Sequence, residues 1–379
     1  MKKFTIFISA GEVSGDVHAS YLSREILKLN PDIKLIGLGS NEMKSANVEI
    51  IYDMSLYSAV GIVENISFLP EIFKTYKIAK NFIAKNKIDL AILVDWQGFN
   101  LRLINLLKKE NIPIVYYIGP QEWIWGFSKN IKKILDKVDI LFAIFKKEYE
   151  TYKPISNNVK YLGNPLLDIL KISDKLEIKK SLGLEKDSIV LGIMPGSRKH
   201  EIKRLLPIFL ETSKELQKVK ENLKTILIIP ALWENFLKNN FDLSGIKLLT
   251  NNSSYYMQAC DLLLVASGTV TLEASILGIP TIANYKVSKL TYIIARMLMK
   301  IEYITLPNII SNKKIISEFL QEDVNSQNLK NECLKLLDNE EIRNKMLKDF
   351  EIVREELKPY GAIEKIARII VKMLYKLNI

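Results

Sequence analysis

Cysteine and histidine are scarce in this chain. The only cysteines are Cys260 and Cys333, and the only histidines are His18 and His200. Two isolated cysteines are too few for a disulfide framework or a thiolate metal site. The scarcity favours a reducing cytoplasm and a chemistry that needs neither a metal nor another cofactor.

Long apolar runs are absent as well. No run approaches the roughly 20 residues that a membrane-spanning helix needs, so any membrane contact is expected to be peripheral. The opening "MKKFTIFISAGE" has only a short apolar stretch before Glu12 and Asp16. That pattern predicts a first strand rather than a signal peptide.

The chain is long, rich in apolar residues and basic. Its 379 residues are 48% apolar, enough for two α/β domains with sizeable cores. The 54 basic side chains outnumber the 43 acidic ones and give a formal charge of +11. This excess suggests an anionic partner, either a nucleic acid, an acidic membrane surface or a phosphorylated substrate.

Short apolar runs alternate with helical patterns in two successive series. Strands are predicted to begin near residues 4, 34, 89, 112, 139 and 159, and then near residues 188, 224, 246, 261 and 280. Two such series predict two doubly wound, Rossmann-like domains, residues 1–170 and 186–344, facing each other across a central cleft. The tail is predicted to form two helices broken at residues 359–361, with residues 345–379 packing back on the first domain.

The segment "GEVSGD" ends the first predicted strand with small and acidic residues. In open parallel sheets, ligands bind outside the carboxyl ends of the strands. We therefore expect a ligand site at this loop, and its candidate residues are Gly11, Glu12, Ser14, Gly15 and Asp16. The spacing is not GxGxxG, which disfavours a nicotinamide-dependent oxidoreductase, and a turn that merely needs two glycines stays open as an alternative.

The segment "ILVDWQGFN" ends another strand with Asp95. A carboxylate at the cleft edge is a candidate general base. The alternative is that Asp95 caps the following helix, a frequent use of aspartate.

The segment "GIMPGSRKHEI" follows a strand with small residues and then a basic one. Gly196 and Ser197 allow backbone N–H groups to approach a phosphate, and Arg198 supplies a guanidinium for a diphosphate. The alternative is an arginine at a solvated helix start.

The segment "VASGTVTLEAS" is the most informative. Ser267 and Gly268 turn out of a strand, Thr269 is expected to cap the next helix, and Glu273 lies one turn further on the same face. Amides and hydroxyls suit a phosphate, and a carboxylate suits the vicinal hydroxyls of a ribose, so a nucleotide sugar would use both. A plain strand-to-helix turn is the alternative.

Two further segments are apolar and aromatic. In "YYIGPQEWIWGFSKN", Trp123 and Trp125 either pack in the core, which is favoured, or line a sugar or acyl site. A basic amphipathic helix is predicted from Phe68, and it is either a membrane-surface helix or a packed helix with a solvated lysine face. Its candidate membrane residues are Leu69, Ile72, Phe73, Lys74, Lys77 and Lys80. A second candidate begins at Lys286.

Together these segments resemble the lipid-A-disaccharide synthase family, glycosyltransferases with the two-domain GT-B fold. The motifs "GEVSGD", "YxxPxxWxW", "GNP", "PGSRxxEI", "ASGTxxLE" and "LPN" occur in family order over about 300 residues, from Gly11 to Asn308. The resemblance implies transfer of 2,3-diacylglucosamine from its UDP derivative to 2,3-diacylglucosamine 1-phosphate. A β-1,6-linked disaccharide phosphate and UDP would form with inversion and without a required metal.

The resemblance also implies roles for individual residues. Asp95 matches the family's catalytic aspartate, and it would remove the proton from the acceptor's 6-hydroxyl. Asn100, which ends the same motif, is expected in the acceptor-side wall of the cleft together with the "GEVSGD" residues, Trp123 and Trp125. Asn308 is expected at the donor site. The chain departs from the family's "IDxPDFN" by placing Gln97 and Gly98 where Pro and a second Asp are usual. Asp95 is therefore the carboxylate that we expect to carry the chemistry.

The resemblance further implies a cytoplasmic protein on the inner face of an anionic membrane, with a homodimer left open. A UDP-sugar epimerase or another UDP-sugar transferase would share the "ASGT" logic and remains the alternative. A nucleic-acid-binding module would explain the charge, but the sequence has neither a zinc-finger spacing nor a clustered arginine stripe, so no nucleic-acid partner is expected.

Overall fold

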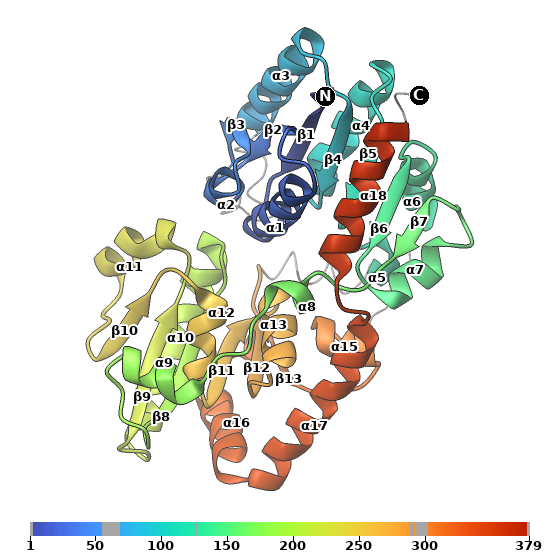
Figure 1. Cartoon of the computed structure of the whole chain (residues 1–379). Helices are drawn as coiled ribbons and strands as arrows, with labels where there is room; N and C mark the ends of the chain where they lie inside the picture. Colours follow the sequence, from blue (N-terminus) through green and yellow to red (C-terminus); the bar gives the residue numbers. More distant parts are fainter. Residues whose placement is uncertain (1–2, 55–68, 126–127, 289–291, 293–301, 377–379) are drawn as a thin grey trace. The chain divides into compact units, whose positions relative to one another are not determined.

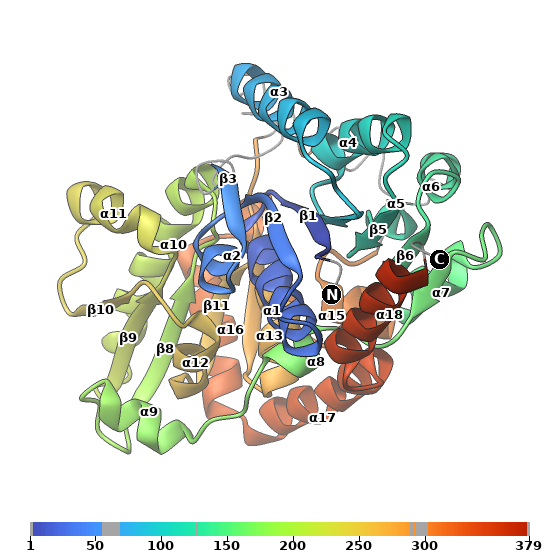
Figure 2. The same cartoon turned by 45° about the horizontal axis from the view of Figure 1, so that its top comes forward.

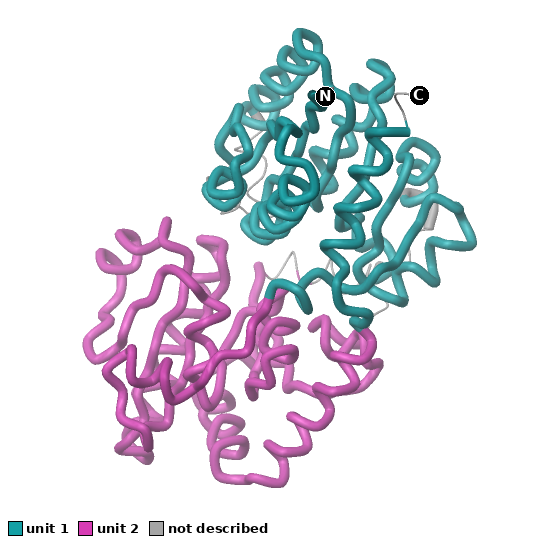
Figure 3. The backbone as a smooth tube through the Cα atoms, viewed as in Figure 1, with its two compact units in different colours: residues 1–169, 357–379 teal, residues 170–356 magenta. Residues whose placement is uncertain are grey.

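The computed structural model describes residues 3–54, 69–125, 128–288, 292 and 302–376. The chain divides into two compact units, shown in Figure 3. Unit 1 comprises Met1–Ile169 and Leu357–Ile379, and unit 2 comprises Leu170–Glu356. None of the helices in the described part of the chain is long and apolar enough to cross a membrane.

Unit 1 contains a seven-stranded parallel sheet in the order β3-β2-β1-β4-β5-β6-β7 (Figure 1). Its strands are β1 (Thr5–Ala10), β2 (Lys34–Gly39), β3 (Glu49–Asp53), β4 (Leu90–Val94), β5 (Ile114–Tyr117), β6 (Ile140–Ala143) and β7 (Val159–Tyr161). Its helices are α1 (Val13–Leu29), α2 (Asn41–Ser45), α3 (Leu69–Lys85), α4 (Gln97–Lys109), α5 (Glu122–Trp125), α6 (Ser128–Leu135), α7 (Lys146–Tyr152), α8 (Leu166–Ile169) and α18 (Ala362–Lys376).

Unit 2 contains a six-stranded parallel sheet in the order β10-β9-β8-β11-β12-β13. Its strands are β8 (Ile189–Met194), β9 (Leu223–Ile228), β10 (Ile246–Leu249), β11 (Leu262–Ala266), β12 (Thr281–Tyr285) and β13 (Ser317–Leu320). Its helices are α9 (Lys175–Ser181), α10 (Lys199–Gln217), α11 (Glu234–Asn240), α12 (Ser253–Tyr256), α13 (Thr269–Leu277), α15 (Leu306–Ser311), α16 (Ser326–Asp338) and α17 (Glu340–Leu357).

Both sheets are doubly wound, as the alternation of strands and helices predicted. The central strands β1, β4, β8 and β11 are apolar along most of their length and nearly fully buried. Strands that are covered by helices on both faces have this composition, because neither face meets water. Figure 2 shows α3 and α4 together at one side of unit 1, with α1 and α18 at another.

The structure adds the edge strands β3 and β13, which the sequence analysis did not predict. The residues of β3 are exposed or half-buried, and those of β13 are half-buried throughout. Edge strands that are short and partly solvated lack the continuous apolar run that signals a buried strand.

The chain ends with the two predicted helices, separated by residues 358–361. Helix α18 packs against α1, and the rings of Phe4 and Tyr375 meet edge to face at 5.2 Å. The return to unit 1 begins at residue 357 in the structure, whereas the expectation placed it at residue 345. The difference arises because α17 is continuous to Leu357.

Candidate functional site

The main motifs lie at the topological switch point of each sheet. In unit 1 the strand order reverses between β1 and β4, which carry "GEVSGD" and Asp95 at their carboxyl ends. In unit 2 it reverses between β8 and β11, which carry "PGSR" and "ASGT". Ligands bind at such points in doubly wound folds, because adjacent loops diverge there and leave a crevice.

The two loops at the switch point of unit 1 touch each other. A Cβ atom added to Gly11 would lie 2.1 Å from Cδ2 of Trp96, so the indole packs directly on the glycine backbone. Trp96 also stacks on Phe99 at 4.0 Å between ring centroids. Gly15 shows no such close approach, since its added Cβ would meet its nearest atoms at 3.8 Å. Gly11 is therefore required by packing.

The remaining residues of the first loop form the start of α1. Glu12 is the residue before the helix and is half-buried, as is Ser14. Asp16 is buried, and its two carboxylate oxygens accept hydrogen bonds from the backbone N–H groups of Ser40 at 2.7 Å and Glu42 at 3.0 Å. Burial raises the pKa of Asp16. Asp16 thus ties α1 to the start of α2, while Glu12 and Ser14 lie nearer the surface.

Asp95 lies on an unusual backbone. Asp95 and Trp96 have φ angles of 48° and 46°, and Ile118, at the end of β5, has a φ of 64°. The Asp95 N–H donates to the Ile118 carbonyl at 3.1 Å. Its own carbonyl accepts from the side chains of Asn100 at 2.7 Å and Tyr116 at 2.9 Å. The left-handed region is unfavourable for residues other than glycine, so these bonds hold the loop in a strained form.

Asp95 lies two residues before the start of α4 and is not its N-cap residue. The N-cap residue of α4 is Trp96, without a side-chain cap, and the Asp95 side chain is only half-buried. The carboxylate stands at the end of β4, ahead of the helix.

Asn100 holds this loop from the interior of unit 1. Its side chain is fully buried, and its amide donates to the carbonyls of Val94 and Asp95 while its oxygen accepts from the Ser9 hydroxyl at 2.7 Å. These bonds occupy the amide inside the protein, so Asn100 positions Asp95 instead of reaching outward.

The departure from the family motif has a local explanation. The Gln97 amide donates to the Glu122 carboxylate at the start of α5 and links the loop after β4 to the loop after β5. Gly98 is exposed, and a Cβ there would meet nothing within 4 Å. The substituted residues therefore fit the turn without strain of their own.

The structure buries Trp123 in the core of unit 1. Its side chain is 8% exposed, its indole N–H donates to Gln121, and its ring lies 5.6 Å from that of Phe145. The side chain of Trp125 lies outside the described residues.

In unit 2, the "PGSR" loop uses a glycine for its turn. Gly196 has a φ of 110°, and a Cβ there would lie 2.2 Å from the Glu201 carboxylate. Glu201 accepts from the Arg198 N–H at 3.2 Å and faces its guanidinium at 3.7 Å. The Ser197 carbonyl accepts from Trp233 at 2.8 Å. The loop is thus anchored from two sides, and the Arg198 side chain remains 35% exposed.

The "ASGT" turn leads directly into α13. The Ser267 N–H donates to the Asn284 carbonyl at 2.8 Å, and its hydroxyl donates to the Ile304 carbonyl at 3.2 Å. The prediction that Thr269 caps the helix is wrong: the N-cap is Gly268, without a side-chain cap, and Thr269 is the first helical residue. The backbone of Gly268 is extended, and a Cβ there would meet nothing within 4 Å. Glu273 is half-buried, and burial raises its pKa to about 7.

Asn308 is buried at the start of α15. Its amide donates to the Ile316 carbonyl and to Glu318, and its oxygen accepts from the N–H groups of Ile315 and Ile316. Its side chain therefore folds the 304–308 loop, which contacts Ser267.

Glu318 on β13 is a residue that the sequence analysis missed. It accepts hydrogen bonds from the N–H groups of Ile304 and Thr305, the Thr305 hydroxyl and the Asn308 amide. These hydrogen bonds hold the 304–308 loop against β13. A single glutamate in an unpredicted edge strand carries no local sequence signal for this role.

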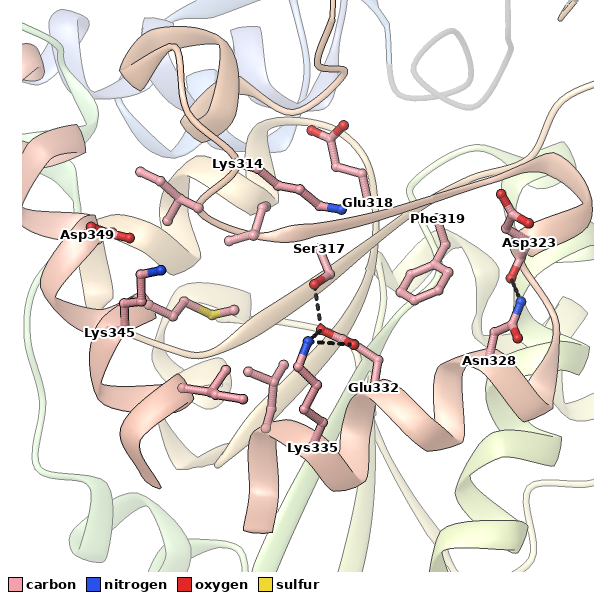
Figure 4. A pocket seen from close by; sticks show the side chains of 15 residues that line it. Lys314, Ser317, Glu318, Phe319, Asp323, Asn328, Glu332, Lys335, Lys345 and Asp349 are labelled. Atoms are coloured by element: carbon pink, nitrogen blue, oxygen red, sulfur yellow. Dashed lines mark hydrogen bonds and ion pairs between the residues drawn. The ribbon is translucent and has the colours of Figure 1, made fainter. Parts of the chain in front are cut away.

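A hollow of about 630 Å³ lies within unit 2, between β13, α16 and α17. Figure 4 shows Ser317 and Lys335 both bonded to Glu332 in it. None of the motif residues lines it. Among the described residues, no group of three His, Cys, Asp or Glu side chains is placed to hold a metal ion.

Helix α3 has the expected two faces. Thr75, Ala79 and Ile83 are buried, whereas Lys74, Lys77 and Lys80 are exposed. Phe73 is 62% exposed on the solvent side, and Ile72 is half-buried. Lys74 pairs with Glu71 at 3.1 Å. The side chain of Leu69, and most of the second candidate from Lys286, lie outside the described residues.

Comparisons with known proteins agree with this geometry. The family model for lipid-A-disaccharide synthetase matches residues 6–370. A lipid-A-disaccharide synthase of Persephonella marina is 38% identical over 98% of both chains.

Two solved structures are similar in fold. The UDP-GlcNAc 2-epimerase of Neisseria meningitidis bound to UDP-GlcNAc has a TM-score of 0.63 at 15% identity, over 99% of this chain and 100% of its own. The calicheamicin glycosyltransferase CalG4 has a TM-score of 0.62 at 12% identity, over 99% of both chains. The fold is the GT-B fold of such transferases and epimerases. With the family model matched over nearly its whole length, the chain belongs to the lipid-A-disaccharide synthase family.

Proposed function

We propose that this protein transfers 2,3-diacylglucosamine from its UDP derivative to the 6-hydroxyl of 2,3-diacylglucosamine 1-phosphate. The products are the β-1,6-linked disaccharide 1-phosphate and UDP. As a member of its family the protein is a hexosyltransferase of lipid A disaccharide synthesis. The observation that carries the proposal is the placement of the main motif loops at the switch points of the two sheets.

In this reaction Asp95 is the general base. Its half-buried carboxylate stands at the end of β4 on a loop that is held by Asn100, Tyr116 and Ile118. The carboxylate accepts the proton of the acceptor hydroxyl as that oxygen attacks the anomeric carbon. The bond to UDP breaks on the opposite face of the sugar, so the configuration inverts.

Unit 2 holds the donor. The Gly196 turn and the N-terminus of α10 present backbone N–H groups, and Arg198 supplies a guanidinium, both of which suit a diphosphate. The N-terminus of α13 adds positive potential. Glu273, on the first turns of α13, accepts from the ribose hydroxyls. These groups stabilise the negative charge that develops on the departing UDP.

Both proposed substrates carry acyl chains, which requires access to a membrane surface. Helix α3 offers exposed lysines for anionic headgroups and an exposed Phe73 for the interface. We place the protein at the cytoplasmic face of the inner membrane, in peripheral contact.

A transfer assay tests the proposal. Purified protein is incubated with both acylated substrates, and the disaccharide phosphate is scored by mass. The control replaces the acceptor with its analogue that lacks the 6-hydroxyl, which should give no product. A folded protein that forms no disaccharide would contradict the proposal, and an epimerised UDP-sugar formed without acceptor would favour the epimerase alternative.

A further inference from the structure

Helix α7 sends two buried side chains to the segment that follows β5, residues 118–123. Tyr152 is 1% exposed, and its hydroxyl donates to the Pro120 carbonyl at 2.7 Å. The same oxygen accepts from the Trp123 N–H at 3.0 Å. One hydroxyl therefore links the backbone of Pro120 to that of Trp123.

Glu148 is the second of these side chains and is fully buried. One carboxyl oxygen accepts from the N–H groups of Ile144 at 2.8 Å and Phe145 at 3.4 Å. The other has no hydrogen-bond partner among the described residues, and a Cβ added to Gly119 would lie 3.3 Å from it. Glu148 thus packs directly against the backbone of the same segment.

The segment in turn holds Asp95 by two links. The Ile118 carbonyl accepts from the Asp95 N–H at 3.1 Å, and Glu122 accepts from the Gln97 amide. Asp95 and Ile118 both have left-handed backbones. Such strain persists only where the surroundings over-determine the conformation.

We propose that α7 positions the loop that carries Asp95. Glu148 and Tyr152 hold the 118–123 segment in place, and this segment holds the backbone of Asp95. The two are positioning residues for transfer, because their contacts reach Asp95 through the backbone of this segment. The inference rests on the proposed function, since it takes Asp95 as the base.

Burial and a nearby carboxylate explain why Glu148 serves as a neutral acid. Burial, with a smaller contribution from Asp95, raises the pKa of Glu148 to about 8. Tyr152, on the same helix, interacts with Glu148 and with Glu122 of α5. Ionisation would place a second anion in a buried site near the Asp95 carboxylate, and it would loosen the packing on Gly119.

The experiment compares the variants Tyr152→Phe, Glu148→Ala and Glu148→Gln in the transfer assay. Tyr149→Phe and Glu150→Gln are matched controls, because they change the same residue types on the same helix at half-buried and exposed positions. We expect Tyr152→Phe and Glu148→Ala to lower kcat by roughly 10- to 100-fold with KM and UDP affinity unchanged. Glu148→Gln should retain activity at pH 7, because an amide keeps the size and neutrality of the acid.

The pH profile separates positioning from a merely structural role. Wild-type kcat should fall as pH rises through about 8, and Glu148→Gln should lack this decline. Wild-type kcat in Tyr152→Phe, or equal losses in the two controls, would overturn the inference. An inactive wild-type protein would overturn the proposed function as well, so the two failures are distinguishable.

Discussion

The two switch points reach their loop shapes by different means. In unit 1, Asp95, Trp96 and Ile118 adopt left-handed backbones although none is glycine. Each such residue costs roughly 1 to 3 kcal/mol, which the surrounding bonds must offset. In unit 2, the turn after β8 has Gly196, which adopts its φ of 110° without that strain.

The difference matches the two tasks. A general base must stand at one place relative to the reacting hydroxyl, so a strained and fully bonded loop is an advantage. A nucleotide needs backbone N–H groups and an accessible cation, which a glycine turn and the partly exposed Arg198 provide. In the proposed function, unit 1 therefore positions the base and unit 2 binds the nucleotide.

The strongest way to break this comparison is Asp95→Asn. The amide keeps the size of the side chain but cannot accept the proton, so kcat should fall by roughly 100-fold or more. UDP affinity and the circular dichroism spectrum should stay at wild-type values, since the backbone bonds of Asp95 are unaffected. Near wild-type turnover would reassign the base, with Glu12 as the next candidate.

The corresponding test in unit 2 is the pair Arg198→Ala and Glu273→Ala. Each removes one charge-assisted contact to UDP, worth roughly 1.5 to 3 kcal/mol, so Kd by calorimetry should rise about 10- to 150-fold. Arg368→Ala is the control, because Arg368 is exposed on α18 and pairs with Glu364. Unchanged UDP binding in both variants would show that the nucleotide site has been misplaced.

The sequence predicts the motifs of this site better than it predicts which residues meet a ligand and which hold the loops. The strand-loop-helix context of Asp95 and Arg198 follows from apolar runs and turn residues, which are local signals. The side chains of Asp16, Asn100 and Asn308 were expected at the site, yet the structure bonds all three internally. A motif contains both the residues that meet a ligand and those that hold the loop, and spacing does not separate them.

The supports that were missed act over long sequence distances. Glu318 folds a loop that begins at Ile304, and Glu148 packs on Gly119. A lone glutamate in a helix or an edge strand looks like an ordinary solvated residue until the fold buries it. The edge strands β3 and β13 were missed for a related reason, because half-burial weakens their apolar pattern.

A smaller effect is expected at the surface of unit 1, where α3 exposes its lysines. Replacing Lys74, Lys77 and Lys80 by Gln should weaken binding to anionic vesicles, measured by sedimentation, by about 30- to 100-fold. Each lysine near such a surface contributes on the order of 1 kcal/mol, and Lys74 contributes less because it pairs with Glu71. The difference should shrink toward 0.5 M salt, because screening weakens charges.

The control for this change is Lys214→Gln with Lys218→Gln, two exposed lysines of unit 2, one on α10 and one directly after it. They should leave vesicle binding unchanged. Turnover of soluble short-chain substrates should also survive in the α3 variant. Equal vesicle binding by the α3 variant and the wild type would mean that its lysines are an ordinary solvated face.

The smallest expected effect concerns the protonation of Glu273. Burial raises its pKa to about 7, so the free protein holds it largely protonated at pH 6 and largely ionised at pH 8. The ribose hydroxyls donate to it, and a carboxylate accepts such bonds more strongly than the acid does. Binding therefore favours the ionised form, and UDP affinity should rise by roughly 5-fold from pH 6 to pH 8.

The control for the pH series must account for UDP itself, because a terminal phosphate titrates near pH 6. Glu273→Gln shares that contribution but has no carboxyl group, so the ratio of wild-type to variant affinity isolates Glu273. We expect this ratio to increase with pH and to level off above pH 8. A ratio that is constant across the series would mean that Glu273 does not meet the ribose, and its raised pKa would then reflect burial at the start of α13 alone. Unit 2 would in that case bind the nucleotide through its loop backbone and Arg198 alone. Unit 1 would then use a carboxylate, Asp95, where unit 2 uses only N–H groups and a guanidinium.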